Sequence, residues 1–144
     1  MARGYPDYFG TSIWPKYGSP LYASYSDVVA AATTVKVLEL AVQGVLLYAH
    51  VFIEDITDFT KVKVRPLLDS VSGYQLQIAE LLSLGFVVGV RNPLVLASYN
   101  GNAGSVCLYV PIEIPFHEGF AIEVFNNQAT DISVIAQCGY YVVT

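Results

Sequence analysis

The residues of this chain that could carry chemistry are few and far apart. His50 and His117 are its two histidines, and neither has a second histidine or a cysteine at the spacing of metal ligands. His117 lies beside Glu118 in a loop and is the better candidate for a functional group, whereas His50 is expected to be a structural residue of a strand. Because no nucleophile or third group accompanies His117, we expect neither a catalytic nor a metal site.

Other motifs of catalysis and cofactor binding do not appear either. No serine stands in a Gly-x-Ser-x-Gly elbow, and residues 101–104 belong to a hairpin instead of opening a helix that could hold a phosphate. The acidic run Glu54–Asp58 lacks the Asp-x-Asp-x-Asp-Gly spacing of a calcium loop, so we expect a solvated turn. The sequence therefore predicts a protein that is not an enzyme and that binds no cofactor.

The two cysteines are predicted to be free thiols. In their strand-like runs Cys107 belongs to the outward set of side chains, and Cys138 belongs to the core set. Side chains on opposite faces do not reach the short Cβ separation that a disulfide needs.

The composition calls for surface that is buried against other subunits. Apolar residues make up 54% of the chain and charged residues 13%, which is unusual for a soluble monomer. A membrane span does not explain this, because the most apolar stretch, Leu38–Ile53, is interrupted by Glu39, Gln43, Gly44 and His50. We therefore expect an obligate oligomer or a component of a lattice.

The charge pattern speaks against nucleic acid as a partner. The net charge is −5, and the basic residues are scattered singly, as Arg3, Lys16, Lys36, Lys61, Lys63, Arg65 and Arg91. No basic patch can be assembled from them. The first residues have no apolar signal region, so we expect synthesis in the cytoplasm.

Period-two alternation is clearest from Ser105 to the C-terminus and predicts β-strands there. A run over Ser105–Ile114 is followed by one over Phe120–Val124 and one over Ile132–Val142, in a meander or a Greek key. The predicted core positions are Val106, Leu108, Val110, Ile112, Ile114, Phe120, Ile122, Val124, Ile132, Val134, Ala136, Cys138, Tyr140 and Val142.

The preceding part of the chain predicts further short strands. Parity breaks within Thr33–Leu40, which indicates a bulge near Val37–Leu38. In Val45–Ile53 both faces are apolar, with Val45, Leu47, Ala49, Val51 and Ile53 on one and Leu46, Tyr48, His50 and Phe52 on the other. Such a strand is expected to be covered on both sides.

Four more runs complete the count. Thr60–Pro66 directs Val62 and Val64 inward and a basic row outward that could protect a sheet edge. Tyr74–Leu84 reads both as strand and as helix, and we favour a strand that runs into a short helical turn. Phe86–Val90 and Pro93–Tyr99 are two more strands. About eight strands at this spacing predict an all-β, antiparallel two-sheet sandwich over residues 28–144.

Residues 1–27 are predicted to form an extended arm. Prolines and glycines are interleaved there with seven aromatic residues, so neither a helix nor a central strand fits. These aromatic residues are the predicted interface anchors: Tyr5, Tyr8, Phe9, Trp14, Tyr17, Tyr22 and Tyr25. Packing on the same domain and packing on a neighbouring subunit both remain open.

In this strand pattern the chain resembles the single jelly-roll structural proteins of virus and phage particles. The resemblance covers roughly Thr33 to Val143, where residues 111–116 precede the runs Gly119–Phe125 and Ile132–Val143 as closing strands. It implies a jelly-roll sandwich, a homo-oligomer such as a trimer, and an arm that reaches across to neighbouring subunits.

Two functions follow as hypotheses. The first is a non-enzymatic virion protein, either a capsid protein or a decoration protein, that assembles through its arm and its apolar sheet faces with other particle proteins. The alternative is a carbohydrate-binding module for surface attachment, with its candidate ligand-binding residues Tyr99, Asn100, Asn102, Tyr109 and Tyr141. A cupin-like enzyme is improbable because it needs clustered histidines.

Overall fold

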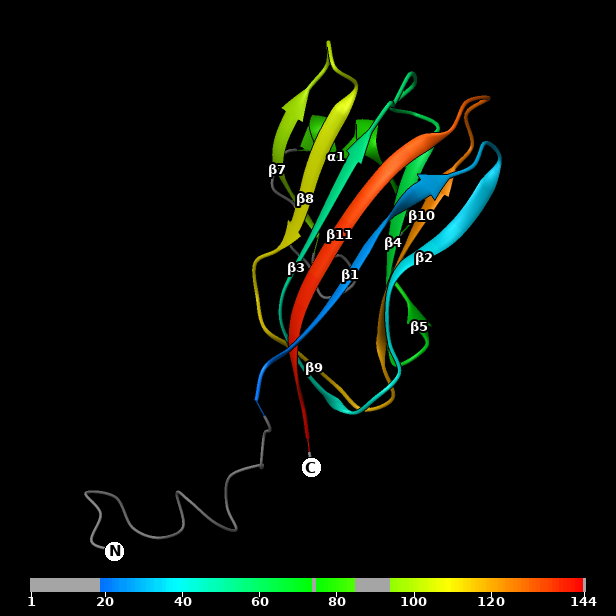
Figure 1. The fold of residues 1–144 in the computed structure, drawn as a ribbon. Helices are drawn as coiled ribbons and strands as arrows, with labels where there is room; N and C mark the ends of the chain where they lie inside the picture. Colours follow the sequence, from blue (N-terminus) through cyan, green and yellow to red (C-terminus); the bar gives the residue numbers. More distant parts are fainter. Residues whose placement is uncertain (1–18, 74, 85–93, 144) are drawn as a thin grey trace, which may run out of the picture.

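Two antiparallel sheets pack face to face in this protein (Figure 1). The structure is a computed structural model that describes residues 19–73, 75–84 and 94–143. The first sheet has the strand order β1 (Leu21–Val29), β11 (Ile132–Val142), β3 (Gly44–Glu54), β8 (Ser105–Val110) and β7 (Val95–Asn100), with β9 (Ile114–Phe116) also paired to β3. The second sheet has the order β2 (Thr33–Leu40), β10 (Phe120–Asn126), β4 (Val62–Leu68) and β5 (Val71–Ser72), with β6 (Leu76–Gln77) also paired to β4.

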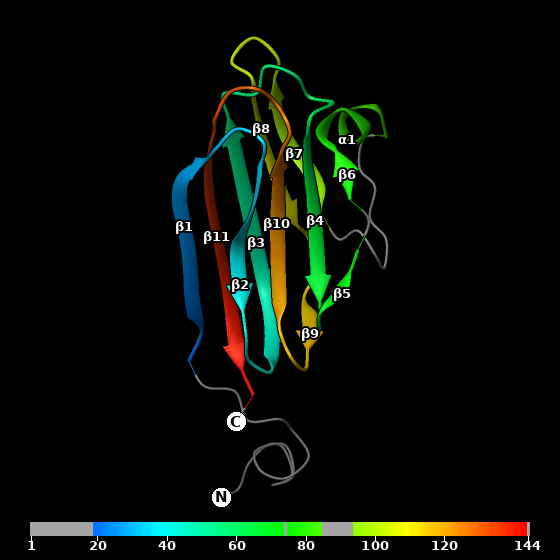
Figure 2. The same ribbon diagram turned by 90° about the vertical axis from the view of Figure 1, so that its right-hand side faces the viewer.

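The strand order is that of a Greek-key sandwich. Neighbours within a sheet are mostly not consecutive in the chain: β11 lies between β1 and β3, and β10 lies between β2 and β4. The chain therefore crosses repeatedly between the two layers, which Figure 2 shows from the β1 and β2 side. This arrangement confirms the predicted all-β, two-sheet jelly roll and favours the Greek key over the meander for the last three strands.

The core between the sheets is formed largely by the residues that the alternation of apolar and polar positions predicted. Val106, Leu108 and Val110 of β8 are buried, and so are the apolar sets of β10 and of β11 as far as Cys138. Tyr140 and Val142 are only half-buried. The predicted single strand over Ser105–Ile114 is wrong, because β8 ends at Val110 and Ile112 is 47% exposed. Pro111 has no N–H to continue the ladder, which explains the break.

Bulges in β2 and β3 shift the alternation of their side chains. In β2 the register moves from Leu38 opposite Ile122 to Lys36 opposite Glu123, so Val37 is the extra residue. Val37 and Leu38 are both buried, and the predicted bulge is confirmed. In β3 the register moves from Tyr48 to Leu46 against β11, so Leu47 is extra. The two predicted faces of β3 are therefore not kept along the whole strand, because Leu46 is buried on the side of Ala49, Val51 and Ile53, whereas Val45 and Leu47 are only half-buried.

The N-terminal strand was not expected. The last residues of the predicted arm, 21–27, belong to β1. This strand pairs with β11 from Leu21 opposite Tyr140 to Val29 opposite Ile132. This is an edge strand, in keeping with the extended conformation that the composition indicated. The arm stays a prediction for residues 1–18, which lie outside the described residues, as does the strand predicted over Phe86–Val90.

The ambiguous run resolves as a strand followed by a helix. β6 is only Leu76–Gln77, and α1 (Ile78–Leu84) begins at the next residue. Ile78 and Leu81, one turn apart, are fully buried and attach the helix to the core. No helix among residues 19–73, 75–84 and 94–143 is long and apolar enough to cross a membrane.

Two buried polar side chains hold the loops at one end of the sandwich. The Asn126 Nδ2 donates to the carbonyl oxygens of Val29 and Thr130 at 3.0 and 2.9 Å. The Gln128 Oε1 accepts from the Thr57 amide at 3.1 Å, and its Nε2 donates to the Asp55 carbonyl at 3.1 Å. These bonds join three connections that are far apart in sequence, and they replace the water that the buried backbone groups have lost.

We predict that Asn126→Ala lowers the free energy of unfolding by about 2 kcal/mol, because the buried carbonyls lose their donor. Chemical denaturation followed by circular dichroism measures this. The matched control is Asn127→Ala at the exposed neighbour, which we expect to change stability by less than about 0.5 kcal/mol. Equal losses in the two variants would contradict the assigned role of Asn126.

Candidate interaction surface

The outward side of the first sheet is the candidate functional surface, called here the outer face. It consists of the side chains that point away from the core on β1, β11, β3 and β8. Cross-strand pairing places them in rows. Its members are Tyr22, Ser24, Ser26, Val28, Ser133, Ile135, Gln137, Gly139, Tyr48, His50, Phe52, Glu54, Cys107 and Tyr109. Glu54, at one end, is the single acidic residue in this set, and the set has no lysine or arginine.

An aromatic cluster marks the centre of the outer face. The Tyr48 and His50 rings lie edge to face at 5.7 Å, and His50 lies 6.2 Å from the Tyr109 ring. Tyr48 and His50 are two positions apart on β3, so they share a face, and Tyr109 is the cross-strand partner of His50 on β8. Gly139 of β11 leaves room for the Tyr48 ring, because a Cβ there would lie 2.5 Å from a ring carbon.

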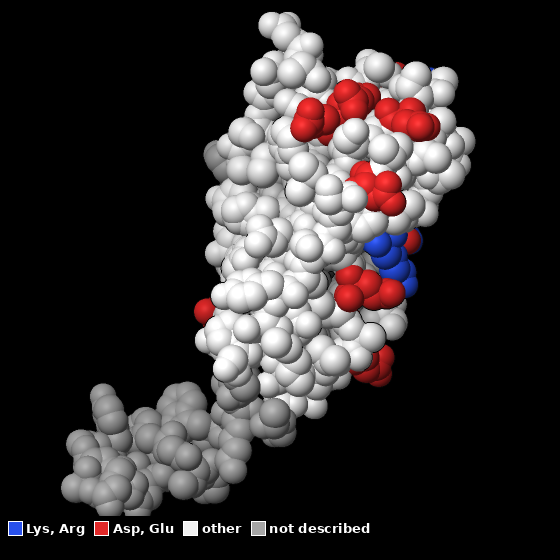
Figure 3. Space-filling view, viewed as in Figure 1, with Lys and Arg blue, Asp and Glu red and all other residues white. Residues whose placement is uncertain are grey.

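Large apolar side chains surround this cluster and are exposed. Tyr22 is 67% exposed, Ile135 is 52% exposed and Val28 is 49% exposed. In Figure 3 the side over β8, β3 and β11 is free of charged residues over most of its length. Acidic residues gather toward the top of the view, the end of the sandwich where β3 ends at Glu54, called here the loop end. A continuous uncharged face of this kind is typical of a surface that a partner covers.

The second sheet has a different outward side. Lys36 and Glu39 form an ion pair at 2.9 Å, and the Arg65 Nη2 lies 2.7 Å from the Glu123 Oε1. Arg65 also lies over the Phe125 ring, at 5.1 Å from its centroid. The basic row was predicted to protect an edge, but β4 is paired with β10 on one side and with β5 and β6 on the other. Its arginine instead forms a part-buried ion pair on the outward side of the second sheet.

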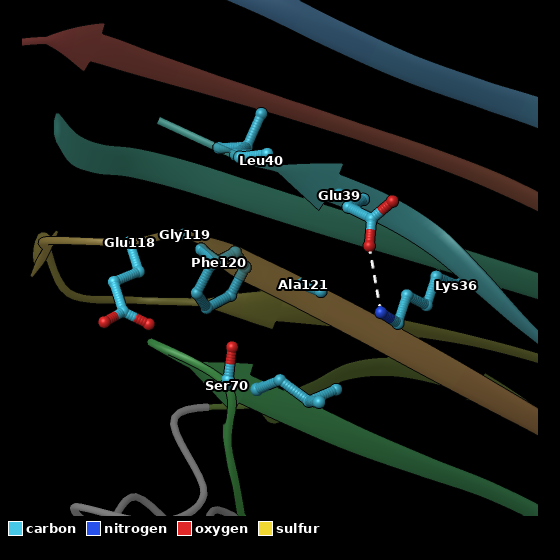
Figure 4. A pocket seen from close by; sticks show the side chains of 10 residues that line it. Lys36, Glu39, Leu40, Ser70, Glu118, Gly119, Phe120 and Ala121 are labelled. Atoms are coloured by element: carbon cyan, nitrogen blue, oxygen red, sulfur yellow. Dashed lines mark hydrogen bonds and ion pairs between the residues drawn. The ribbon is translucent and has the colours of Figure 1, made fainter. Parts of the chain in front are cut away.

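A shallow hollow of about 200 Å³ lies on that second side (Figure 4). Lys36 and Glu39 line it from β2, Phe120 and Ala121 from β10, and Ser70 from the β4–β5 turn. The Lys36 and Glu39 side chains are engaged with each other, as Figure 4 shows. The hollow's other polar side chains are those of Ser70 and Glu118.

Asp69 fastens the turn beside this hollow. Its Oδ1 accepts hydrogen bonds from the amides of His117, Glu118 and Gly119 at 2.8, 2.7 and 3.2 Å. These bonds hold the pKa of the Asp69 carboxyl below its usual value. Asp69 and Ser70 have φ of 50° and 65°, so they form the tight two-residue turn from β4 to β5. The Asp69 carboxylate thus attaches the loop that contains His117 to the turn between β4 and β5.

The predicted sugar-binding residues are not gathered at one place. Tyr99, Asn100 and Asn102 share the β7–β8 hairpin, where the Tyr99 ring packs on Phe59 at 5.3 Å. The Asn100 Oδ1 accepts from the amides of Asn102 and Ala103 and so closes the turn. Tyr109 belongs to the outer face. Tyr141 lies at the far end of β11, opposite Val45.

The predicted interface residues divide in a similar way. Tyr22 points outward on β1, whereas Tyr25 is half-buried and packs against the core. Burial, with a smaller effect of Asp27, raises the pKa of Tyr25. The anchors Tyr5, Tyr8, Phe9, Trp14 and Tyr17 lie outside the described residues. Cys107 was predicted to face outward, but sequence reasoning did not place it in one continuous patch with Ile135, although the apolar set of Tyr48, His50 and Phe52 was a signal of such a patch.

The described part of the chain contains two cysteines and two histidines. Cys107 and Cys138 are free, as predicted, and burial raises the pKa of both thiols. The His117 Nδ1 lies 3.2 Å from the Gln43 Nε2. Within residues 19–73, 75–84 and 94–143 no three histidine, cysteine or acidic side chains come together at metal-binding distance.

Comparisons with known proteins place the fold. No protein-family model and no curated protein matches the sequence. The structure is similar to a chain of the acidic stable capsid of Helicobacter pylori bacteriophage KHP30, with a TM-score of 0.54 and 6% identity over 91% of this chain and 94% of that chain. It is also similar to a chain of the cyanophage Pam1 capsid asymmetric unit, with a TM-score of 0.50 and 15% identity over 99% of this chain and 91% of that chain. The predicted resemblance to phage jelly-roll proteins is confirmed for the fold.

The Asp69 contacts predict a dependence of stability on pH. Because the folded-state pKa is lowered, the stabilisation is present at neutral pH and is lost as the pH falls through that pKa, below about pH 4. We expect the stability difference between the wild type and Asp69→Ala to shrink on acidification, as measured by urea denaturation at several pH values. Glu113→Ala, at an exposed position, is the control. A difference that does not vary with pH would contradict this prediction.

Proposed function

We propose that this protein is a structural component of a phage or virus particle and that it resides in the virion. The fold supports this, because it aligns with chains of two phage capsids over at least 91% of each chain. The observation that carries the proposal is the contrast between the two sheets. One outward side has ion pairs suited to water, and the other is an aromatic and aliphatic face without basic residues.

The outer face supports association with other particle proteins or with further copies of the same chain. Solvated sheets of antiparallel proteins alternate apolar and polar side chains, so a face with Tyr22, Ile135 and Phe52 on its outside departs from that pattern. Covering these residues removes apolar surface from water, which is the main favourable contribution to protein association. The role is therefore structural and does not depend on catalysis. A trimer is the oligomer that the resemblance implies.

Two roles fit this proposal, a shell-forming protein and a decoration protein bound to a shell. Solution mass separates them from each other. A shell-forming protein yields large closed particles on its own, whereas a decoration protein yields small oligomers that bind a preformed particle. Light scattering and electron microscopy of the purified full chain give this result.

We predict that Ile135→Lys weakens association through the outer face and leaves the fold intact. A lysine at this exposed position costs little in the free subunit, but burial at an interface leaves its charge unpaired. We expect association to weaken by about tenfold or more, measured by sedimentation. The matched control is Val71→Lys, at a residue 69% exposed on the second sheet. Equal assembly by both variants would count against the outer face as an interface.

Deletion of residues 2–18 tests the second part of the proposal, that the N-terminal arm contributes to assembly. The deletion stops before β1, because the loss of residues 21–26 would remove most of an edge strand of the first sheet. We expect a folded protein of lower oligomeric mass in light scattering, with a thermal unfolding midpoint close to that of the full chain. An unchanged oligomeric mass would show that the arm is dispensable for assembly.

A further inference from the structure

We propose that the aromatic segment of residues 5–17 of one copy lies across the outer face of a neighbouring copy, around His50. The inference rests on the proposed assembly function and names the two surfaces that meet. It commits to one occupant, the N-terminal segment of this chain. A second sheet packed flat on the outer face is the competing occupant, and the experiment below separates the two.

The side chains of the outer face differ in exposure from one position to the next. Tyr48 and Phe52 are half-buried, whereas His50 between them is exposed. Ile135, opposite Phe52 on β11, is also exposed. Exposed and half-buried side chains therefore lie next to one another on β3 and β11. Aromatic side chains cover such a surface with large contact area at a low cost in side-chain entropy.

The segment has the composition that such a surface requires. Residues 1–18 include Tyr5, Tyr8, Phe9, Trp14 and Tyr17, together with Pro6 and Pro15. Proline has no N–H to donate to a ladder, so a segment with two prolines is poorly suited to extend a sheet at its edge. It is better suited to lie on a face and to bind through its side chains.

The charges of the two partners are complementary. Residues 1–18 contain two basic residues, Arg3 and Lys16, and one acidic residue, Asp7, which gives +1. The remaining residues, 19–144, contain 5 basic and 11 acidic residues, which gives −6. Glu54, the acidic member of the outer face, lies at its loop end, with Asp55 next to it. The net charges of the segment and of the folded part are therefore opposite, while the outer face itself carries one carboxylate, Glu54, and has an uncharged aromatic centre that suits the aromatic residues of the segment.

The length of the segment is sufficient for the contact. At about 3.3 Å per residue, 18 extended residues span up to about 59 Å, whereas the 11 residues of β3 span about 36 Å. The segment can therefore leave its own sandwich and still cross the whole face of another.

The junction with β1 favours a neighbouring copy over the same copy. The segment joins the fold just before Leu21, at the edge strand, so it must reverse direction at once to cover its own sheet. Pro20 lacks the N–H that would close a tight turn ending there, and proline is disfavoured at the third position of a turn ending one residue later. Continuing away from its own sheet avoids both problems.

The test is site-specific photo-crosslinking in the assembled full chain. The photoreactive residue p-benzoylphenylalanine replaces Tyr109 on the outer face, or Phe125 on the second sheet as the matched control, since both are half-buried. Mixed heavy and light isotopic copies distinguish crosslinks between copies from crosslinks within one. We expect position 109 to crosslink to residues 5–17 of another copy, about tenfold more often than position 125 does.

Three outcomes would overturn the inference: crosslinks from position 109 to folded residues of a second copy, crosslinks to the segment of the same copy, or no crosslink to the segment. A second variant is Trp14→Ala, within the segment, and we expect it to lower the crosslink yield without lowering the thermal unfolding midpoint. If assembly persists while the crosslinks lie elsewhere, the docking site is wrong and the proposed function stands. If no association occurs, both fail.

Discussion

The burial of the two inner sheet faces against each other is the interaction on which the rest of the structure depends. Each strand contributes one set of alternate residues to this core, and the opposite set is thereby directed outward. The bulges at Val37 and Leu47 adjust this assignment, so that Leu46 and Ala49 can both be buried on one strand. The composition of the outward sets is then what distinguishes the two sides of the molecule: one has ion pairs, and the other has a single acidic residue and no basic one.

Much of the fold could be predicted from the sequence because alternation records burial directly. The core positions of β8, β10 and β11, the bulge in β2, and the strand that runs into α1 were all predicted. The bulge at Leu47 was not, because Val45, Leu46 and Leu47 are all apolar and carry no parity signal. β1 was missed for a related reason. Ala23 and Tyr25 pack inward, but they follow a stretch rich in prolines and aromatic residues and share its composition, so all of residues 1–27 were assigned to the arm.

The candidate surface was harder to predict, since it is a property of several strands side by side. The apolar second face of β3 was visible in the sequence and indicated a cover. That Ile135, His50 and Tyr109 lie next to one another follows only from the pairing of β11 with β3 and of β3 with β8. Residues for sugar binding were chosen by type alone, and the pairing separates Tyr109 and Tyr141 from the hairpin that holds the other three.

The place of β11 in the first sheet has a consequence for the order of events during synthesis. β11 follows all other strands in the chain, yet it lies between β1 and β3 and pairs with both. On a ribosome, β1 and β3 therefore emerge well before the strand that unites them, and such non-local pairing is slow to form. Until β11 pairs with them, β1 and β3 each have an unpaired edge and the core is open on that side, so the incomplete sheet is exposed to wrong pairing and aggregation during this interval.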